Sequence, residues 1–299
     1  MKSVLFGILC LLLPMTGTAA EGAPKYVIVS DIDDTIQKSQ IHWKLNPIAF
    51  AKNLFAFHDA FIGMPALYNA LANDGMAFHY VTAAPKIIGS FPQRFLETSG
   101  FPAGTLWTRN SVFDPKADFK EAKILDLMRA HPDSLFILVG DNGEKDVPAY
   151  KRVQDHPEFG KRVIHTFIHK LYDDKTGVPL EPGQKPYIST AEITLDLRDA
   201  DLLNDRASEA ILKQVERGLQ SRSSRIEQLT IPEFATYDQS SIKALATRAL
   251  NEPNSEIRRL ILSIATSMSE RLNPADRHIL PRLLEQRGIM IGRCSNALM

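Results

Sequence analysis

The feature that most constrains the fold is residues 26–35, where an apolar run ends in acidic side chains. The run 26–30 is short and rich in β-branched residues, and Asp31, Asp33 and Asp34 follow it directly. Such a run is typical of a parallel strand that is buried on both faces. Open α/β sheets bind ligands at the carboxyl edge of their strands, so the acids fall where a site is expected. Because three carboxylates this close repel one another, we expect a cation among them.

The rest of the first half of the chain alternates between apolar runs and helical patterns. The alternation predicts an α/β fold, a Rossmann-like domain with a parallel sheet and right-handed crossovers. The 299 residues are 44% hydrophobic, and 35 basic side chains balance 35 acidic ones, so net charge predicts neither nucleic-acid nor membrane binding. The expected strands are 26–30, 77–82, 105–108, 135–140 and 162–169, and the expected helices are 65–74, 86–99 and 117–130.

The first twenty residues have the pattern of a targeting segment. Lys2 precedes an apolar run that ends before Pro14, and small residues lead up to Ala20. This pattern predicts a signal peptide over residues 1–20, and hence an exported protein that is periplasmic or secreted. An uncleaved anchor is the alternative. Cys10 would leave with the signal, so the mature chain would keep Cys294 and form no intrachain disulfide.

The remaining boundaries follow changes in composition. A catalytic domain is expected over residues 21–175, with a possible cap insertion after strand 1 over residues 36–63. That insertion is rich in aromatic residues, and it is either a lid over the strand ends or an ordinary helix packed on the sheet. A Pro- and Gly-rich linker is expected over residues 176–198, and a helical C-terminal region over residues 199–299.

Further polar residues occur at the ends of later expected strands and in an expected helix. Thr82 ends the second apolar run, Lys120 lies near the start of the helical pattern 117–130, and Asp141 ends the fourth run with Asp146 just beyond it. Parallel strand ends converge at one edge, so we expect these groups beside the first acids. Lys116 and Lys123 compete with Lys120 for the role of a buried cation, and Asp146 could instead cap a helix.

This order of motifs resembles the haloacid dehalogenase superfamily of phosphotransferases. The resemblance implies that Asp31 is a nucleophile forming an aspartyl-phosphate and that Asp33 is the general acid and base. It implies that Thr82 and Lys120 bind phosphate. It also implies a magnesium ion (Mg²⁺). The implied metal ligands are the carboxylates of Asp31, Asp141 and Asp146 and the backbone carbonyl of Asp33.

A closer resemblance covers roughly residues 25–172. The segments DIDDTI (31–36), YVTAAP (80–85), SGFPAG (99–104) and FILVGDNGEKD (136–146) are similar to the catalytic domain of the actin-patch-associated phosphatidate phosphatase family. That family implies magnesium-dependent hydrolysis of phosphatidate to diacylglycerol and phosphate. Two positions depart from its pattern, with Asn142 where serine is expected and Lys145 where histidine is expected.

Three functions therefore stay open. The favoured one is an exported phosphatase acting on phosphatidate. The others are a phosphatase of soluble phosphomonoesters and a non-catalytic binding or effector protein that uses the fold as a scaffold. The expected partners are a phosphomonoester substrate, a membrane surface touched peripherally and a protein docked on residues 199–299, with no nucleic acid.

Overall fold

The computed structural model describes residues 23–39, 59–86, 89–110, 115–143, 145–172, 177–221, 239–270 and 279–285. The predicted signal peptide lies outside these residues, as does the centre of the predicted insertion, residues 40–58. The two ends of that insertion are described. They run side by side, because Gln37 and Ala60 form an antiparallel bridge and the Phe61 N–H donates to the Ile36 carbonyl (3.0 Å).

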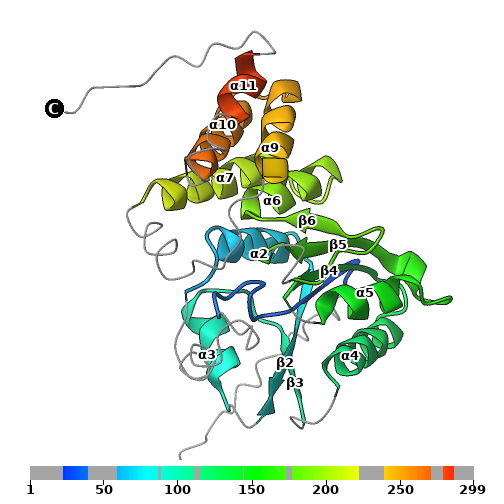
Figure 1. Ribbon diagram of the computed structural model, residues 1–299. Helices are drawn as coiled ribbons and strands as arrows, with labels where there is room; N and C mark the ends of the chain where they lie inside the picture. Colours follow the sequence, from blue (N-terminus) through cyan, green and yellow to red (C-terminus); the bar gives the residue numbers. More distant parts are fainter. Residues whose placement is uncertain are drawn as a thin grey trace, which may run out of the picture.

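Six parallel strands form the central sheet, so the prediction of an α/β fold with a parallel sheet is confirmed. The strand order is β3-β2-β1-β4-β5-β6, which places β1 between β2 and β4 at the centre (Figure 1). A central strand has neighbours on both sides, which matches its unbroken apolar sequence. The strands are β1 (Tyr26–Ser30), β2 (Ala77–Pro85), β3 (Thr105–Arg109), β4 (Leu135–Asp141), β5 (Val163–His169) and β6 (Lys185–Tyr187).

Helices cover both faces of the sheet. Val27 and Val29 of β1 face one cluster of apolar side chains, which includes Ile124 of α4, while Ile28 faces a second cluster, which includes Leu67 of α2. This alternation follows from the two-residue period of a strand. The helices on the first face are α4 (Lys116–Ala130) and α5 (Asp146–Gln154), and those on the second are α2 (Met64–Asn73), α3 (Phe91–Thr98) and α6 (Thr190–Asp199).

The stretch predicted to be a linker, residues 176–198, holds regular structure instead. β6 adds a sixth strand at the edge of the sheet, and α6 begins at Thr190. The prediction was wrong because β6 is only three residues long and contains Pro186, which is tolerated at a sheet edge. α6 buries Ile193 and Leu195, and the side chains of Ser189 and Glu192 form a capping box at its start.

The C-terminal region is helical, as predicted, and it shares the core of the sheet domain. One continuous apolar cluster runs from Ile28 in β1 to Leu260 in α10. Gly63 marks a close approach within it, because a Cβ there would lie 2.7 Å from Val215 Cγ2 in α7. The helices are α7 (Asp205–Gln220), α9 (Gln239–Asn251), α10 (Ser255–Ser269) and α11 (Ile279–Glu285).

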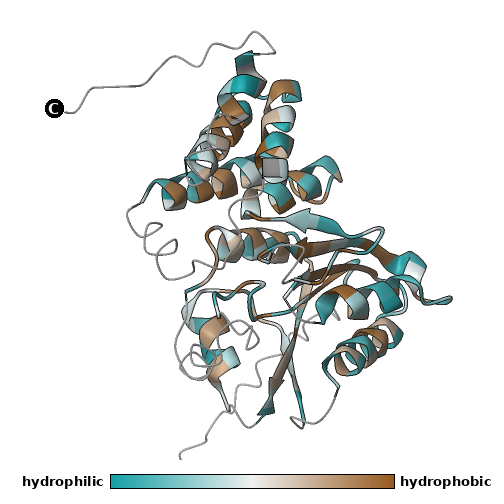
Figure 2. Ribbon diagram, viewed as in Figure 1, coloured by the Kyte–Doolittle hydropathy of each residue, from teal (hydrophilic) through white to brown (hydrophobic). Residues whose placement is uncertain are grey.

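Hydropathy follows these layers. Figure 2 shows hydrophobic residues in the inner strands of the sheet, and helices along which hydrophobic and hydrophilic residues alternate. This is the pattern of helices with one face packed on a core and the other in water. Within the described residues, none of the helices combines the length and the hydropathy that crossing a bilayer requires.

Candidate active site

The carboxyl edge of the sheet gathers the acidic residues. Asp31 is the first residue beyond β1, and its N–H continues the sheet by donating to the Val139 carbonyl (2.9 Å). Asp141 is the last residue of β4, and Asp146 is the first residue of α5. Carboxylate oxygens of Asp31, Asp141 and Asp146 lie within 4.8 Å of one another, and all three residues are buried. The fold therefore brings together three acids from a sequence span of 115 residues.

Lys120 supplies a buried positive charge to this cluster. Its Nζ lies 3.0 Å from Asp31 Oδ1 and also forms an ion pair with Asp146. Its two competitors lie elsewhere, because Lys123 pairs with Asp126 (3.1 Å) on the surface and Lys116 lines an outer groove. Among these three lysines, Lys120 is thus the one that contacts the acids.

The charges of the cluster strongly perturb one another. Burial raises the pKa of Asp31 well above its usual range, and the nearby carboxylates of Asp146 and Asp33 add to the rise against the opposing charge of Lys120. Burial also raises the pKa of Asp141, with further contributions from Asp146 and Asp31. For Lys120, burial alone would lower the pKa, but the surrounding carboxylates outweigh burial and raise it. One ammonium thus does not balance the acids around it.

A divalent metal ion would fit the three carboxylates. Asp31 Oδ1 is buried, and the partner that it contacts is Lys120 Nζ (3.0 Å), so a second lone pair of this oxygen stays available for a metal. Carboxylate oxygens are the ligands that hard cations such as magnesium prefer. Asp33 was predicted to bind the metal through its backbone carbonyl, and its side-chain oxygens accept hydrogen bonds from Ser39 and Thr82. The structure thus provides an acidic triad that could bind a metal.

Local structure explains why Asp146 reaches the cluster. It does not cap α5 through its side chain, and instead its Oδ2 accepts a hydrogen bond from the Asp141 N–H (3.2 Å). Gly140 makes room for it, because a Cβ at that position would lie 2.7 Å from both Asp146 Cβ and Tyr150 Cε2. This requirement for glycine at position 140 was not identified from the sequence, because the residue lies within an expected strand.

Asp33 and Thr82 meet at the same edge. Thr82 Oγ1 donates to Asp33 Oδ2 (3.2 Å) and accepts from the Ala84 N–H (3.0 Å), so Thr82 contacts the acid and shapes the turn as well. The other oxygen of Asp33, Oδ1, accepts from Ser39 Oγ (2.8 Å). Ser39 was not singled out in the sequence, because a single serine after a turn carries no distinctive signal.

Asp34 supports the loop that carries the acids. Its φ of 58° is in the left-handed region, which non-glycine residues rarely adopt. Its carboxylate accepts hydrogen bonds from the Ser39 N–H (3.0 Å) and the Tyr172 hydroxyl (2.9 Å). Its carbonyl lies 2.9 Å from Nδ1 of the buried His169. The sequence could not show these contacts, since Tyr172 and His169 lie more than a hundred residues away.

Asn142 has a structural role that accounts for its place in the motif. Its side-chain oxygen accepts from the N–H groups of Leu171 and Tyr172 (2.9 and 3.1 Å), and its amide donates to the Tyr172 carbonyl (2.8 Å). Asn142 therefore joins the loop after β4 to the loop after β5, and holds the segment that carries the Tyr172 hydroxyl.

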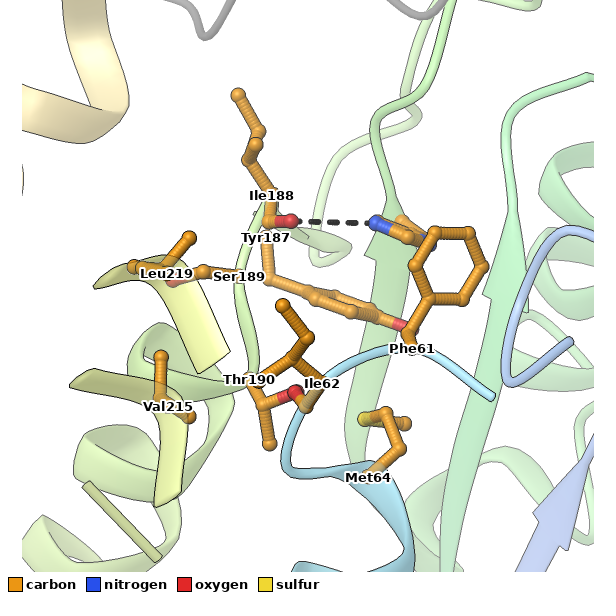
Figure 3. A pocket seen from close by; sticks show the side chains of 10 residues that line it. Phe61, Ile62, Met64, Tyr187, Ile188, Ser189, Thr190, Val215 and Leu219 are labelled. Atoms are coloured by element: carbon orange, nitrogen blue, oxygen red, sulfur yellow. Dashed lines mark hydrogen bonds between the residues drawn. The ribbon is translucent and has the colours of Figure 1, made fainter. Parts of the chain in front are cut away.

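Two concave regions lie near this edge. A small cavity of about 50 Å³ lies behind the loop after β1, where His169 stacks on Tyr187 with ring centroids 4.7 Å apart. Figure 3 shows this cavity and the contact between the Ile188 carbonyl and the histidine ring. The second is an open groove of about 520 Å³ beside the N-termini of α4 and α5. Its lining includes four basic and two acidic side chains: Lys116, Lys145, Lys151, Arg152, Asp118 and Glu181.

Comparison with known proteins agrees with the resemblance predicted from the sequence. Residues 26–170 match the model of a family described as phosphatidate phosphatase APP1, catalytic domain. The chain is 24% identical over 207 residues to an uncharacterized protein of Schizosaccharomyces pombe, over 61% of this chain and 34% of that protein. It is 25% identical over 164 residues to phosphatidate phosphatase APP1 of Saccharomyces cerevisiae, over 51% of this chain and 27% of that protein.

The matches thus span 34% and 27% of the length of these two relatives. Among solved structures, a class C acid phosphatase from Bacillus anthracis with tungstate bound is similar at 16% identity and a TM-score of 0.34. That match covers 61% of this chain and 81% of the phosphatase chain.

Proposed function

Because residues 26–170 belong to the family of the phosphatidate phosphatase APP1 catalytic domain, we propose that this protein is a magnesium-dependent phosphatase with Asp31 as its nucleophile. One observation carries the proposal. The Asp31 carboxylate lies 3.0 Å from Lys120 Nζ inside a cluster of buried acids, at the edge of the sheet where ligands bind. A carboxylate in this setting can attack a phosphate only if its charge and that of the phosphate are offset.

The chemistry has two displacements. Asp31 attacks the phosphorus of a phosphomonoester, the bond from phosphorus to the leaving oxygen breaks, and Asp33 gives that oxygen its proton. Water then attacks the aspartyl-phosphate, Asp33 takes up a proton from it, and phosphate leaves with the Asp31 carboxylate restored. Lys120 and Thr82 would hold the phosphoryl oxygens. Magnesium, held by Asp31, Asp141 and Asp146, would neutralise charge on the phosphoryl group.

We propose phosphatidate as the substrate. The family supports this, since its named member in Saccharomyces cerevisiae is a phosphatidate phosphatase. The basic groove beside α4 and α5 also supports it, because its cations would face the anionic surface in which such a lipid lies. A soluble phosphomonoester is the competing substrate, and its hydrolysis would follow the same two displacements.

We also propose that the protein acts outside the cytoplasm, in the periplasm or after secretion. The support is the leader pattern over residues 1–20, with Lys2, an apolar run and small residues up to Ala20. Sequencing the N-terminus of protein recovered from the periplasmic fraction or the medium of its own cells tests this. We expect a chain beginning at Glu21, whereas a full-length chain in the cytoplasm would contradict the proposal.

The proposed activity is tested on purified mature protein with a panel of phosphomonoesters. The panel contains phosphatidate in vesicles, an alkyl phosphate and an aryl phosphate, each with magnesium and with chelator. We expect phosphate release with magnesium, none with chelator, and none from Asp31→Asn. Release from the soluble esters with none from phosphatidate would reject the lipid substrate, and no release from any ester would reject the phosphatase.

A further inference from the structure

The carboxylate of Asp33 is held by two hydroxyl groups, and one of them has no role in the predicted motifs. We propose that Ser39 is a positioning residue for Asp33, and that Asp34 and Tyr172 hold Ser39 in place for this task. This inference rests on the proposed function, because it concerns how well Asp33 delivers a proton to the leaving oxygen.

The first step is the contact between Ser39 and Asp33. Ser39 Oγ donates to Asp33 Oδ1 at 2.8 Å, while Thr82 Oγ1 donates to Oδ2 at 3.2 Å. Ser39 is only 1% exposed, so its hydroxyl is held by its surroundings. With a donor at each oxygen, the Asp33 carboxylate has one favoured orientation. Removing Ser39 Oγ would take away the shorter of these two contacts.

The second step is the contact that fixes Ser39. The Ser39 N–H donates to Asp34 Oδ1 (3.0 Å), and the Asp34 N–H lies 3.3 Å from Ser39 Oγ. The other carboxylate oxygen of Asp34 accepts from the Tyr172 hydroxyl (2.9 Å). A chain of hydrogen bonds therefore runs from Tyr172 through Asp34 and Ser39 to Asp33.

The backbone conformation of Asp34 also supports this role for its side chain. Its φ of 58° is one that glycine adopts freely and that most side chains oppose. A residue with a carboxylate stands there, and both oxygens of that carboxylate hold the loop. The side chain thus contributes contacts that glycine could not make. Asp34→Gly would keep the backbone conformation and remove those contacts.

A positioning role and a merely structural role predict different results. A merely structural loss lowers activity on every ester by the same factor. A poorly placed Asp33 matters most when the departing oxygen needs a proton, as an alkoxide does. It matters least for an aryl phosphate such as p-nitrophenyl phosphate, whose leaving group departs as an anion. The ratio of the two losses therefore separates the two roles.

The test compares kcat/KM, which reports the first displacement and not the shared second one, on an alkyl phosphate and on p-nitrophenyl phosphate for wild type, Ser39→Ala and Ser39→Thr. General acid catalysis contributes on the order of 10²–10⁴-fold, so partial misplacement should cost about tenfold or more on the alkyl ester. We expect a loss of less than about threefold on the aryl ester, and recovery in Ser39→Thr, which keeps the hydroxyl. Asp34→Gly and Tyr172→Phe should show the same pattern more weakly. Ser263→Ala, on α10, is the matched control.

Equal losses on both esters, or no loss on either, would overturn this inference while leaving the proposed function intact. A wild type inactive on both esters would instead overturn the proposed function and this inference with it. If Ser39→Ala does not fold, as judged by circular dichroism, Tyr172→Phe removes a single hydroxyl and decides the same question.

Discussion

Replacing Asp141 by asparagine should make the metal-free protein more stable while weakening its response to magnesium. Asp141 is buried, and its carboxylate lies within 4.8 Å of those of Asp31 and Asp146. Two like charges at this separation repel by about 3.5 kcal/mol at an effective dielectric constant of about 20. Asparagine has nearly the same shape and can still accept the hydrogen bond that the Gly143 N–H donates to Oδ1.

Protonation limits how much the repulsion can cost. Because burial and the neighbouring acids raise the pKa of Asp141 from 3.8, the carboxyl can take up a proton in the folded state. Holding that proton at pH 7 costs at most about 4 kcal/mol, at about 1.36 kcal/mol per pH unit. A buried amide N–H without a partner costs about 1–3 kcal/mol. We therefore expect a net gain in unfolding free energy of about 2 kcal/mol for Asp141→Asn.

The sign of the pH dependence follows from the raised pKa. The folded wild type binds more protons at this site than the unfolded chain. Its unfolding free energy is therefore lower than that of the variant only above about pH 3.8. The difference in unfolding free energy grows as pH rises from 3.8 toward the folded pKa and is complete above it. The gain of Asp141→Asn should accordingly be small near pH 4 and larger at pH 7.

Urea unfolding in chelator and in magnesium measures both effects. In chelator the variant should be the more stable protein, and magnesium should stabilise the wild type more than the variant, since ligand binding to the folded state adds stability. Asp133→Asn, at an exposed site, is the matched control and should change stability by no more than about 0.5 kcal/mol. A variant that is less stable than wild type in chelator would refute the reasoning.

Two further predictions concern other parts of the molecule. Burial lowers the pKa of His169 from 6.5 to about 4. The contribution of the neutral ring to stability is therefore present above pH 6.5 and is lost as pH falls toward 4. Between pH 7 and pH 5, urea unfolding should show that the wild type loses about 2 kcal/mol more unfolding free energy than His169→Gln. An equal loss in both proteins would contradict this. The double variant Lys116→Glu with Lys151→Glu reverses two charges of the groove, and it should lower hydrolysis of phosphatidate in anionic vesicles several-fold without lowering hydrolysis of p-nitrophenyl phosphate. Lys243→Glu on α9 is the control. Activity on vesicles equal to that of the wild type would exclude the groove from membrane contact.

The parts of the fold that the sequence predicted are those that local pattern determines. β1 and β4 are unbroken apolar runs because they lie at the centre of the sheet, and their ends place Asp31 and Asp141 side by side. β6 escaped prediction because a short edge strand needs no apolar run and can hold Pro186.

The contacts of the loop after β1 could not be predicted from the sequence for a different reason. Asp34 meets Tyr172 and His169 only because β1 and β5 end at the same edge, with β4 between them. No periodicity links residues that far apart in the chain. The shared core of the sheet and the C-terminal helices was hidden in the same way, because a helical pattern shows an apolar face without showing what covers it.

The central claim is that Asp31 carries the phosphoryl group, and trapping that group tests it most directly. In Asp33→Asn, p-nitrophenyl phosphate can still transfer its phosphoryl group, because its leaving group needs no proton, but the second displacement lacks its base. Acid quenching in magnesium, digestion and mass spectrometry should then find a phosphorylated peptide with the modification on Asp31. Asp31→Asn should yield none. A phosphoryl group on another residue, or phosphate release by Asp31→Asn at the wild-type rate, would contradict the account.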